Sequence, residues 1–263
     1  MDKKLNWNKG GTDVFKLFVF SDVHGFYDEL REALDEAGFD QNNSEHIAVC
    51  LGDTTDRGTQ PQEVIDYLTS LPRKVLVKGN HESLIMRCIE RGYPERHDWH
   101  NGTAQTIIDL APQAVNFYDA CSVAYEKMQS FIDSMVNYYE TKHYIFVHSF
   151  VPLKNCDGLP IYYTKNRKFE VDPDWRHAHA SAWEEARWGN PFDLAAQGLL
   201  PDKTLVFGHY HTSWPRYKYE GKPEMGDKAD FLPYYGNGYI GIDACTAYSK
   251  KVNVLVLEDE FLT

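Results

Sequence analysis

Residues 47 to 58 read IAVCLGDTTDRG, and the architecture of the chain can be inferred outward from them. The apolar run from Ile47 to Leu51 stops at Gly52, and charged and hydroxyl side chains follow at once. Short apolar and β-branched runs bounded by glycine are typical of buried strands. This segment therefore predicts a buried strand whose carboxyl end opens into a polar loop.

Four more apolar runs end at polar residues in the same way. They are Phe15–Phe20 before SDVHG, Lys74–Lys78 before GNHE, Tyr144–Val147 before HS, and Thr204–Phe207 before GHYH. Apolar residues at helical spacing follow the polar loops at 21–25, 52–58 and 79–82. Strand, loop and helix repeated in this order predict a layered α/β fold.

The remaining segments are expected to complete a single domain over residues 1–263. Residues 90–142 carry no comparable strand and predict a mostly helical insertion between two core strands. Residues 212–238 are rich in Tyr, Trp, Pro and Gly and predict a long irregular loop. Two further strands are expected over Tyr239–Ile242 and Val252–Leu257.

The composition limits the classes of partner. The 263 residues carry 27 Lys and Arg against 39 Asp and Glu, so the net charge is −12. This acidity argues against nonspecific nucleic-acid binding and against an anionic membrane surface. The 5 cysteines form no CxxC pair, which favours a reducing compartment. Met1 to Trp7 lacks the apolar core of a secretion signal, and no run reaches the ~18 apolar residues of a membrane span, so we expect a cytoplasmic protein.

Polar side chains collect at the carboxyl ends of the predicted strands, where ligands bind in open α/β sheets. The side chains found there are Asp22, His24, Asp53, Asp56, Asn80, His81, His148, His209 and His211. Carboxylates, imidazoles and one carboxamide without a thiolate suit Mn, Fe, Zn or Co. Because a carboxylate can bridge two cations, we expect two divalent metal ions, with manganese as the first choice.

At these residues the chain resembles the calcineurin-like metallophosphoesterase family, and more narrowly its protein-phosphatase-like branch (Ser/Thr phosphatases and diadenosine tetraphosphatases). The family pattern is DxH, GDxxDRG, GNHE, a strand-end His and GHxH, and all five blocks stand here in that order, within about residues 15 to 257. The resemblance implies a layered αββα sandwich. Any one block alone is a weak signal, whereas five in order after apolar runs form a strong one.

The resemblance also implies a role for each matching residue. One metal would be held by Asp22, His24 and His211, the other by Asn80, His148 and His209, with Asp53 bridging the two. It implies that His81 protonates the leaving oxygen, that Asp56 orients His81, and that Arg57 grips the phosphate oxygens. Substrate binding would further involve Asn80 and Arg187, the latter taken from the stretch SAWEEARWGN at 181–190.

The expected activity is a metal-dependent phosphoester hydrolase, a phosphomonoesterase in which a metal-bound hydroxide attacks phosphorus. The resemblance implies a phosphorylated substrate, either a phosphoprotein or a bis-nucleoside polyphosphate. A phosphodiesterase or nuclease is the alternative, since the second histidine of GHxH, His211, is typical of the broader family. A non-catalytic metal-binding or scaffolding protein is a third interpretation. Whether His211 is a direct ligand, whether Arg57 only forms a structural ion pair, and the oligomeric state stay open.

Overall fold

The computed structural model describes residues 14–155 and 169–261, so the N-terminal stretch Met1 to Trp7 lies outside the described residues. Its helices and strands follow one another in this order: β1 (Val14–Phe20), α1 (Tyr27–Glu36), β2 (His46–Cys50), α2 (Pro61–Ser70), β3 (Lys74–Leu76), α3 (Asn80–Arg91), α4 (Arg96–Asn101), α5 (Thr103–Asp109), α6 (Phe117–Asp133), β4 (Tyr139–Glu140), β5 (Tyr144–Phe146), β6 (Leu153–Asn155), β7 (Phe169–Val171), the 3₁₀ turn η1 (Trp175–His177), α7 (Ala180–Ala186), α8 (Pro191–Ala196), β8 (Thr204–Phe207), α9 (Ser213–Glu220), β9 (Tyr234–Gly236), β10 (Tyr239–Gly241), α10 (Thr246–Ser249) and β11 (Leu255–Glu260).

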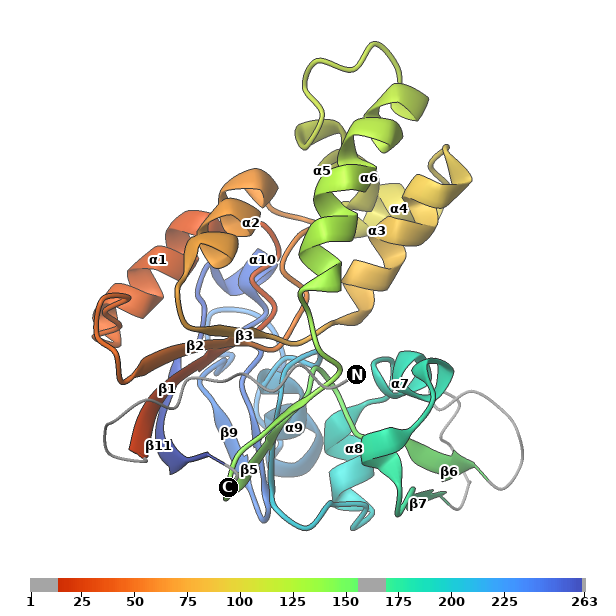
Figure 1. Cartoon of the computed structure of the whole chain (residues 1–263). Helices are drawn as coiled ribbons and strands as arrows, with labels where there is room; N and C mark the ends of the chain where they lie inside the picture. The colour runs from red at the N-terminus through yellow and green to blue at the C-terminus, as the bar shows by residue number, and fades with distance from the viewer. Residues whose placement is uncertain (1–13, 156–168, 262–263) are drawn as a thin grey trace.

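Two sheets form the centre of the molecule (Figure 1). The first has the strand order β11-β1-β2-β3, and the second has the order β4-β5-β8-β10-β9. Strands β1, β2 and β3 are mutually parallel, and so are β5, β8 and β10. Antiparallel strands flank them: β11 borders the first sheet, and β4 and β9 border the second. The carboxyl ends of six parallel strands are therefore available to build a site.

Alternation of side chains along β1 explains how the first sheet is covered on both faces. Leu17 and Val19 point into a core that also contains Phe146 and Val206 of the second sheet. Phe18 and Phe20 point the other way and pack against helices α1 and α2. Because successive strand residues face opposite sides, one continuous apolar run fills both the space between the sheets and the space under the helices.

The second sheet repeats this arrangement. Ile145 and Leu205 leave the inter-sheet core and pack with Trp183 of α7 and Phe192 of α8. The order of layers is helices, sheet, sheet, helices, and the predicted αββα sandwich is confirmed.

The predicted helical insertion consists of α4, α5 and α6, which project from the sandwich beside α3 (Figure 1). The side chains Ile107, Ala120 and Ala124 of these helices join the core formed by α1, α2 and α3. The end of the range differs from expectation, since Tyr139–Glu140 forms the edge strand β4. Among the described helices, none combines the length and apolarity needed to cross a bilayer.

Two segments have a different structure from the one that the sequence predicted. Residues 212–238 contain helix α9 and strand β9, so the irregular loop expected over the whole range is confined to residues 221–233. Pro215 is compatible with α9 because it lies in the first turn, where its missing N–H is not needed, and Trp214 packs near Phe192. The last strand covers Leu255–Glu260 and not Val252–Leu257. Its register is set by antiparallel pairing with β1, which carries it past the apolar run into charged residues.

We expect Gly52→Ala to be strongly destabilising. Gly52 has φ of +95°, and a Cβ there would lie 2.4 Å from the backbone nitrogen of Gly79, so β2 and β3 could not keep their spacing. Gly221→Ala is the matched control, because Gly221 has φ of +68° but no atom within 4 Å of the added carbon. Urea unfolding should show a loss above about 3 kcal/mol for Gly52→Ala against about 1 kcal/mol for the control. Equal losses would contradict the steric explanation.

Candidate metal centre and acid dyad

The predicted site residues lie where the parallel strands of both sheets end. They are, in order of the strands that carry them, Asp22 and His24 after β1, Asp53 and Asp56 after β2, Asn80 and His81 after β3, His148 after β5, and His209 after β8. All but His209 are buried, and His209 is half-buried. Side chains separated by more than a hundred residues thus meet at one edge of the sandwich.

The backbone of these loops is unusual. In the described part of the chain, eight non-glycine residues have positive φ, and six of them belong to the predicted site: Asp22, His24, Asp53, Asp56, Arg57 and His209. Left-handed backbone of this kind is rare for non-glycine residues and costs on the order of 1 kcal/mol or more each. Surrounding contacts must therefore hold the loops in place.

Glu82 supplies several of these contacts, a role that the sequence analysis did not assign to it. The fully buried carboxylate accepts the backbone N–H groups of Asp53 and Thr54 at 3.1 and 2.9 Å and the Thr54 hydroxyl at 2.8 Å. It also accepts the Gly79 N–H at 2.7 Å, across the first turn of α3. The signal was present in the sequence, because a Glu at the third position of a helix is the residue whose side chain accepts the backbone N–H of the helix cap, here Gly79.

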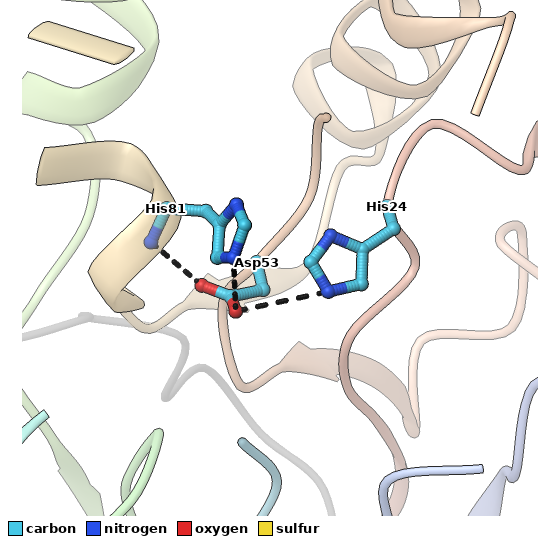
Figure 2. A group of neighbouring side chains, drawn as sticks. All are labelled: His24, Asp53 and His81. Atoms are coloured by element: carbon cyan, nitrogen blue, oxygen red, sulfur yellow. Dashed lines mark hydrogen bonds and ion pairs between the residues drawn. The ribbon is translucent and has the colours of Figure 1, made fainter. Parts of the chain in front are cut away.

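Asp53 stands at the centre of the first group of side chains (Figure 2). Its Oδ2 lies 3.8 Å from His24 Nε2 and 3.9 Å from His81 Nε2, and its Oδ1 accepts the backbone N–H of His81 at 2.9 Å. Asp22 Oδ1 is 4.0 Å from His24 Nε2. Two carboxylates and an imidazole nitrogen therefore face one another across the space that one ion would fill.

The other carboxylate oxygen of Asp53 faces a second group. His148 Nε2 lies 3.5 Å from Asp53 Oδ1, 2.8 Å from Asn80 Oδ1 and 3.2 Å from His209 Nδ1. Since Asp53 belongs to both groups, one carboxylate separates two sets of ligand atoms.

The orientation of two histidines tests whether cations fit these two places. His24 and His148 each direct Nδ1 at a backbone carbonyl, of Thr55 at 3.0 Å and of Leu51 at 2.7 Å. A carbonyl only accepts, so Nδ1 carries the proton in both rings and Nε2 is the atom directed at the site. In the second group His148 Nε2 converges with Asn80 Oδ1 and a carboxylate oxygen of Asp53. Such nitrogen and oxygen donors bind divalent cations, so the donor set fits a metal.

Burial and close contact shift the pKa values of several side chains in the site. Burial would raise the pKa of Asp53, but His148, His81, His24 and His209 outweigh burial and hold it well below the usual range. The pKa of Asp22 is raised by burial and then by the neighbouring carboxylates of Asp243 and Asp53. Burial lowers the pKa of His209 to about 3, so this imidazole is neutral and able to ligate a metal.

His81 and Asp56 form a dyad beside these groups. His81 Nδ1 lies 2.7 Å from Asp56 Oδ2, and both side chains are buried. Burial favours the neutral imidazole, but Asp53 and Asp56 outweigh it and raise the pKa of His81. Arg57 places a guanidinium nitrogen 3.4 Å from His81 Nε2, at the mouth of the site.

Most of these groups, though not Asp56 or His148, line one cavity. Its walls are formed by Asp22, His24, Asp53, Arg57, Asn80, His81, Leu84, Asn101, Trp188, His209 and Asp243. A cation (Arg57), an imidazole that can be protonated (His81) and the ligand atoms around Asp53 thus open into the same space. Such a cavity suits an anionic substrate that approaches bound metal ions.

Two predicted site residues, His211 and Arg187, are held by contacts outside the two groups around Asp53. His211 Nδ1 lies 2.9 Å from the Ser213 hydroxyl, and its Nε2 is 3.5 Å from Glu224. Arg187 is buried with every side-chain nitrogen engaged: Nε donates to the Lys78 carbonyl, and the other two reach Glu184 and Asn137. Neither side chain lines the cavity, which also holds for Asp56 and His148, so the roles that the resemblance implies for His211 and Arg187 stay predictions.

Three cavity residues were missed in the sequence. Asp243 follows β10, and the rule that polar residues collect at strand ends would have found it just after Ile242. Asn101 ends α4 and brings the helical insertion to the cavity. Trp188 follows α7, and no local pattern distinguishes it from a packed tryptophan.

Comparison with known proteins gives the family. The model of the family described as calcineurin-like phosphoesterase matches residues 15–240. An asymmetrical bis(5'-nucleosyl)-tetraphosphatase of Halalkalibacterium halodurans is 33% identical over 102 residues, which cover 35% of this chain and 40% of that protein. Serine/threonine-protein phosphatase 2 of Escherichia coli is 32% identical over 76 residues, covering 29% of this chain and 34% of that protein. Each match therefore spans less than half of the relative.

The solved structures agree at the level of the fold. The cold-active protein-tyrosine phosphatase of a psychrophilic Shewanella superposes with a TM-score of 0.56 at 17% identity, over 92% of this chain and 75% of that one. A likeness at this identity concerns the arrangement of the strands and helices alone.

Asp243→Asn should change how stability depends on pH in the metal-free protein. Burial raises the pKa of Asp243 from 3.8 to about 6, so the native state holds the proton more tightly than the unfolded chain. This contribution to stability is present at low pH and is lost as the pH rises from about 4 through 6. As the pH rises from 4 to 7, the free energy of unfolding of the variant should increase relative to that of the wild type by on the order of 2 kcal/mol. Urea unfolding in the presence of a chelator would measure this difference. A difference that does not change with pH would refute the buried charge.

Proposed function

We propose that this chain, which belongs to the calcineurin-like phosphoesterase family, is a metal-dependent phosphoester hydrolase in which His81 is the general acid. The observation that carries the proposal is the His81–Asp56 dyad, 2.7 Å between Nδ1 and Oδ2, set beside two groups of ligand atoms that share Asp53. A site that only bound metal would not need an imidazole held by a buried carboxylate and aimed into the cavity.

Six side chains would hold two divalent cations. Asp22, His24 and Asp53 would hold one, and Asp53, Asn80, His148 and His209 the other. We leave His211 out of this set because its ring nitrogens are engaged by Ser213 and Glu224. Oxygen and nitrogen ligands without a thiolate suit manganese first, with iron, zinc or cobalt as alternatives.

Each step of hydrolysis can be assigned to groups of this chain. When bound, the two cations would lower the pKa of a coordinated water and neutralise phosphate charge. Arg57 would grip two phosphate oxygens through its planar guanidinium. As a water oxygen bonds to phosphorus and the bond between phosphorus and the leaving oxygen breaks, His81 Nε2 would give its proton to the leaving oxygen, while Asp56 holds Nδ1 and stabilises the imidazolium.

The substrates we propose are phosphate monoesters of proteins or bis-nucleoside polyphosphates. The names of the relatives in Halalkalibacterium halodurans and Escherichia coli support these two classes. The net charge of −12 argues against nucleic acid as the substrate, and a cytoplasmic location remains our proposal. His211 was the residue that favoured a diesterase, and our proposal does not use it because its ring nitrogens lie against Ser213 and Glu224.

The number of metal ions bound per chain should depend on whether the substituted residue belongs to one ligand group or, like Asp53, to both. After dialysis against Mn²⁺, elemental analysis should find two ions per wild-type chain, one in His209→Gln, and neither retained in Asp53→Asn, because that carboxylate belongs to both groups. His179→Asn is the control, since this exposed helix cap lies outside both groups and asparagine can cap equally well. An Asp53→Asn protein that keeps two ions would rule out the shared ligand.

His81→Asn should retain the metal and lose turnover by roughly 100-fold or more, because the acid is removed and no proposed ligand is touched. The assay would use a phosphopeptide, diadenosine tetraphosphate and a phosphodiester with Mn²⁺ added, and His179→Asn should stay fully active. Hydrolysis of the diester alone would favour the nuclease interpretation. Metal binding by the wild type without turnover of any of the three would favour a scaffolding protein.

A further inference from the structure

The turn that carries Asp56 and Arg57 is held from outside the sandwich. Both residues have left-handed backbone, with φ of 72° and 63°, and the turn continues into Gly58, whose N–H bonds to the His24 carbonyl at 2.7 Å. Neither Asp nor Arg favours this conformation on its own. Contacts from elsewhere must therefore fix the direction in which the Asp56 carboxylate points.

Those contacts come from the helical insertion. Thr103 Oγ1 donates to Asp56 Oδ2 at 2.6 Å, and the Asp56 backbone N–H donates to Thr106 Oγ1 at 3.0 Å. Both threonines lie on α5 and are almost completely buried. Gly102 fits closely as well, because a Cβ there would lie 2.3 Å from the Arg57 backbone nitrogen. Three contacts thus tie the start of α5 to the turn.

The two oxygens of Asp56 are unequal. Oδ2 accepts from both His81 Nδ1, at 2.7 Å, and Thr103, at 2.6 Å. Oδ1 is buried and has no hydrogen-bond partner in the described structure. Without Thr103, only the imidazole of His81 would define the rotation of the carboxylate, and the unpaired Oδ1 would compete for the same proton.

We propose that the insertion serves as the positioning element of the acid dyad, and that Thr103 is its positioning residue. Thr103 acts through Asp56, which orients His81, and the inference rests on the proposed function of His81. It gives a role to a segment whose own sequence carries no part of the five-block pattern. Thr103 does not line the cavity, so it acts without touching substrate.

Thr103→Val tests this with substrates that differ in their need for an acid. An alkyl phosphate, such as a phosphoserine peptide, has a poor leaving group and depends on protonation, whereas 2,4-dinitrophenyl phosphate leaves without it. We expect kcat to fall at least tenfold for the alkyl ester and less than threefold for the dinitrophenyl ester, with KM unchanged. Thr103→Ser keeps the hydroxyl and should restore kcat.

Thr141→Val is the matched control. Thr141 Oγ1 also donates to a carboxylate at 2.6 Å, that of Asp259, and is equally buried, but it lies outside the cavity. This variant should lose thermal stability and keep kcat on both esters. If Thr103→Val behaves like the control, or slows both esters equally, its role is only structural and the proposal is overturned.

A spectroscopic measurement separates this proposal from the proposed function. The Nδ1 proton of His81 should give a downfield NMR signal in the wild type that disappears in His81→Asn and shifts or broadens in Thr103→Val, but not in Thr141→Val. An unchanged signal in Thr103→Val overturns the positioning role even if the enzyme is active. If the wild type hydrolyses neither ester and the signal still shifts in Thr103→Val, the positioning role is supported and the proposed function is refuted.

Discussion

The buried carboxylate of Asp53 lies between two groups of potential metal-ligand atoms, one at each of its oxygens. His24 approaches one oxygen at 3.8 Å and His148 approaches the other at 3.5 Å. These carboxylate oxygens and imidazole nitrogens converge as the ligands of a cation do. Burial and then the neighbouring carboxylates raise the pKa of Asp22, the surrounding histidines hold the pKa of Asp53 low against burial, and burial lowers the pKa of His209.

The loops that hold these groups have strained backbone. Hydrogen bonds from residues that are not proposed ligands offset that strain. The loops adopt left-handed backbone at Asp22, Asp53 and Asp56, among others. Glu82 binds the backbone of the β2 loop, and Thr103 and Thr106 bind Asp56. Strain at a functional site persists only where the surroundings define it completely. Here a helix of the core and a helix of the insertion share that task.

The extent of what could be predicted differs between local and long-range features. Runs such as Phe15–Phe20 identified strands correctly, because a strand buried on both faces must be apolar throughout. The end of the chain was harder to predict, since pairing with β1 and not apolarity sets the limits of β11. Helix α9 was missed because Pro and Gly are read as breakers, although Pro215 in a first turn is compatible with a helix.

For the site as well, local placement could be predicted from the sequence and contacts between distant residues could not. The order of carboxylates and histidines after each strand follows from the amino-acid sequence, because a loop residue next to a strand end must lie near the edge of the sheet. Which of those side chains meet depends on neighbours that are distant along the chain. Asp243 enters the cavity, whereas Ser213 and Glu224 hold His211, and Glu184, Asn137 and the Lys78 carbonyl hold Arg187. The sequence places a residue in a loop, but the direction of its side chain is set by hydrogen bonds and charges that exist only once the chain has folded.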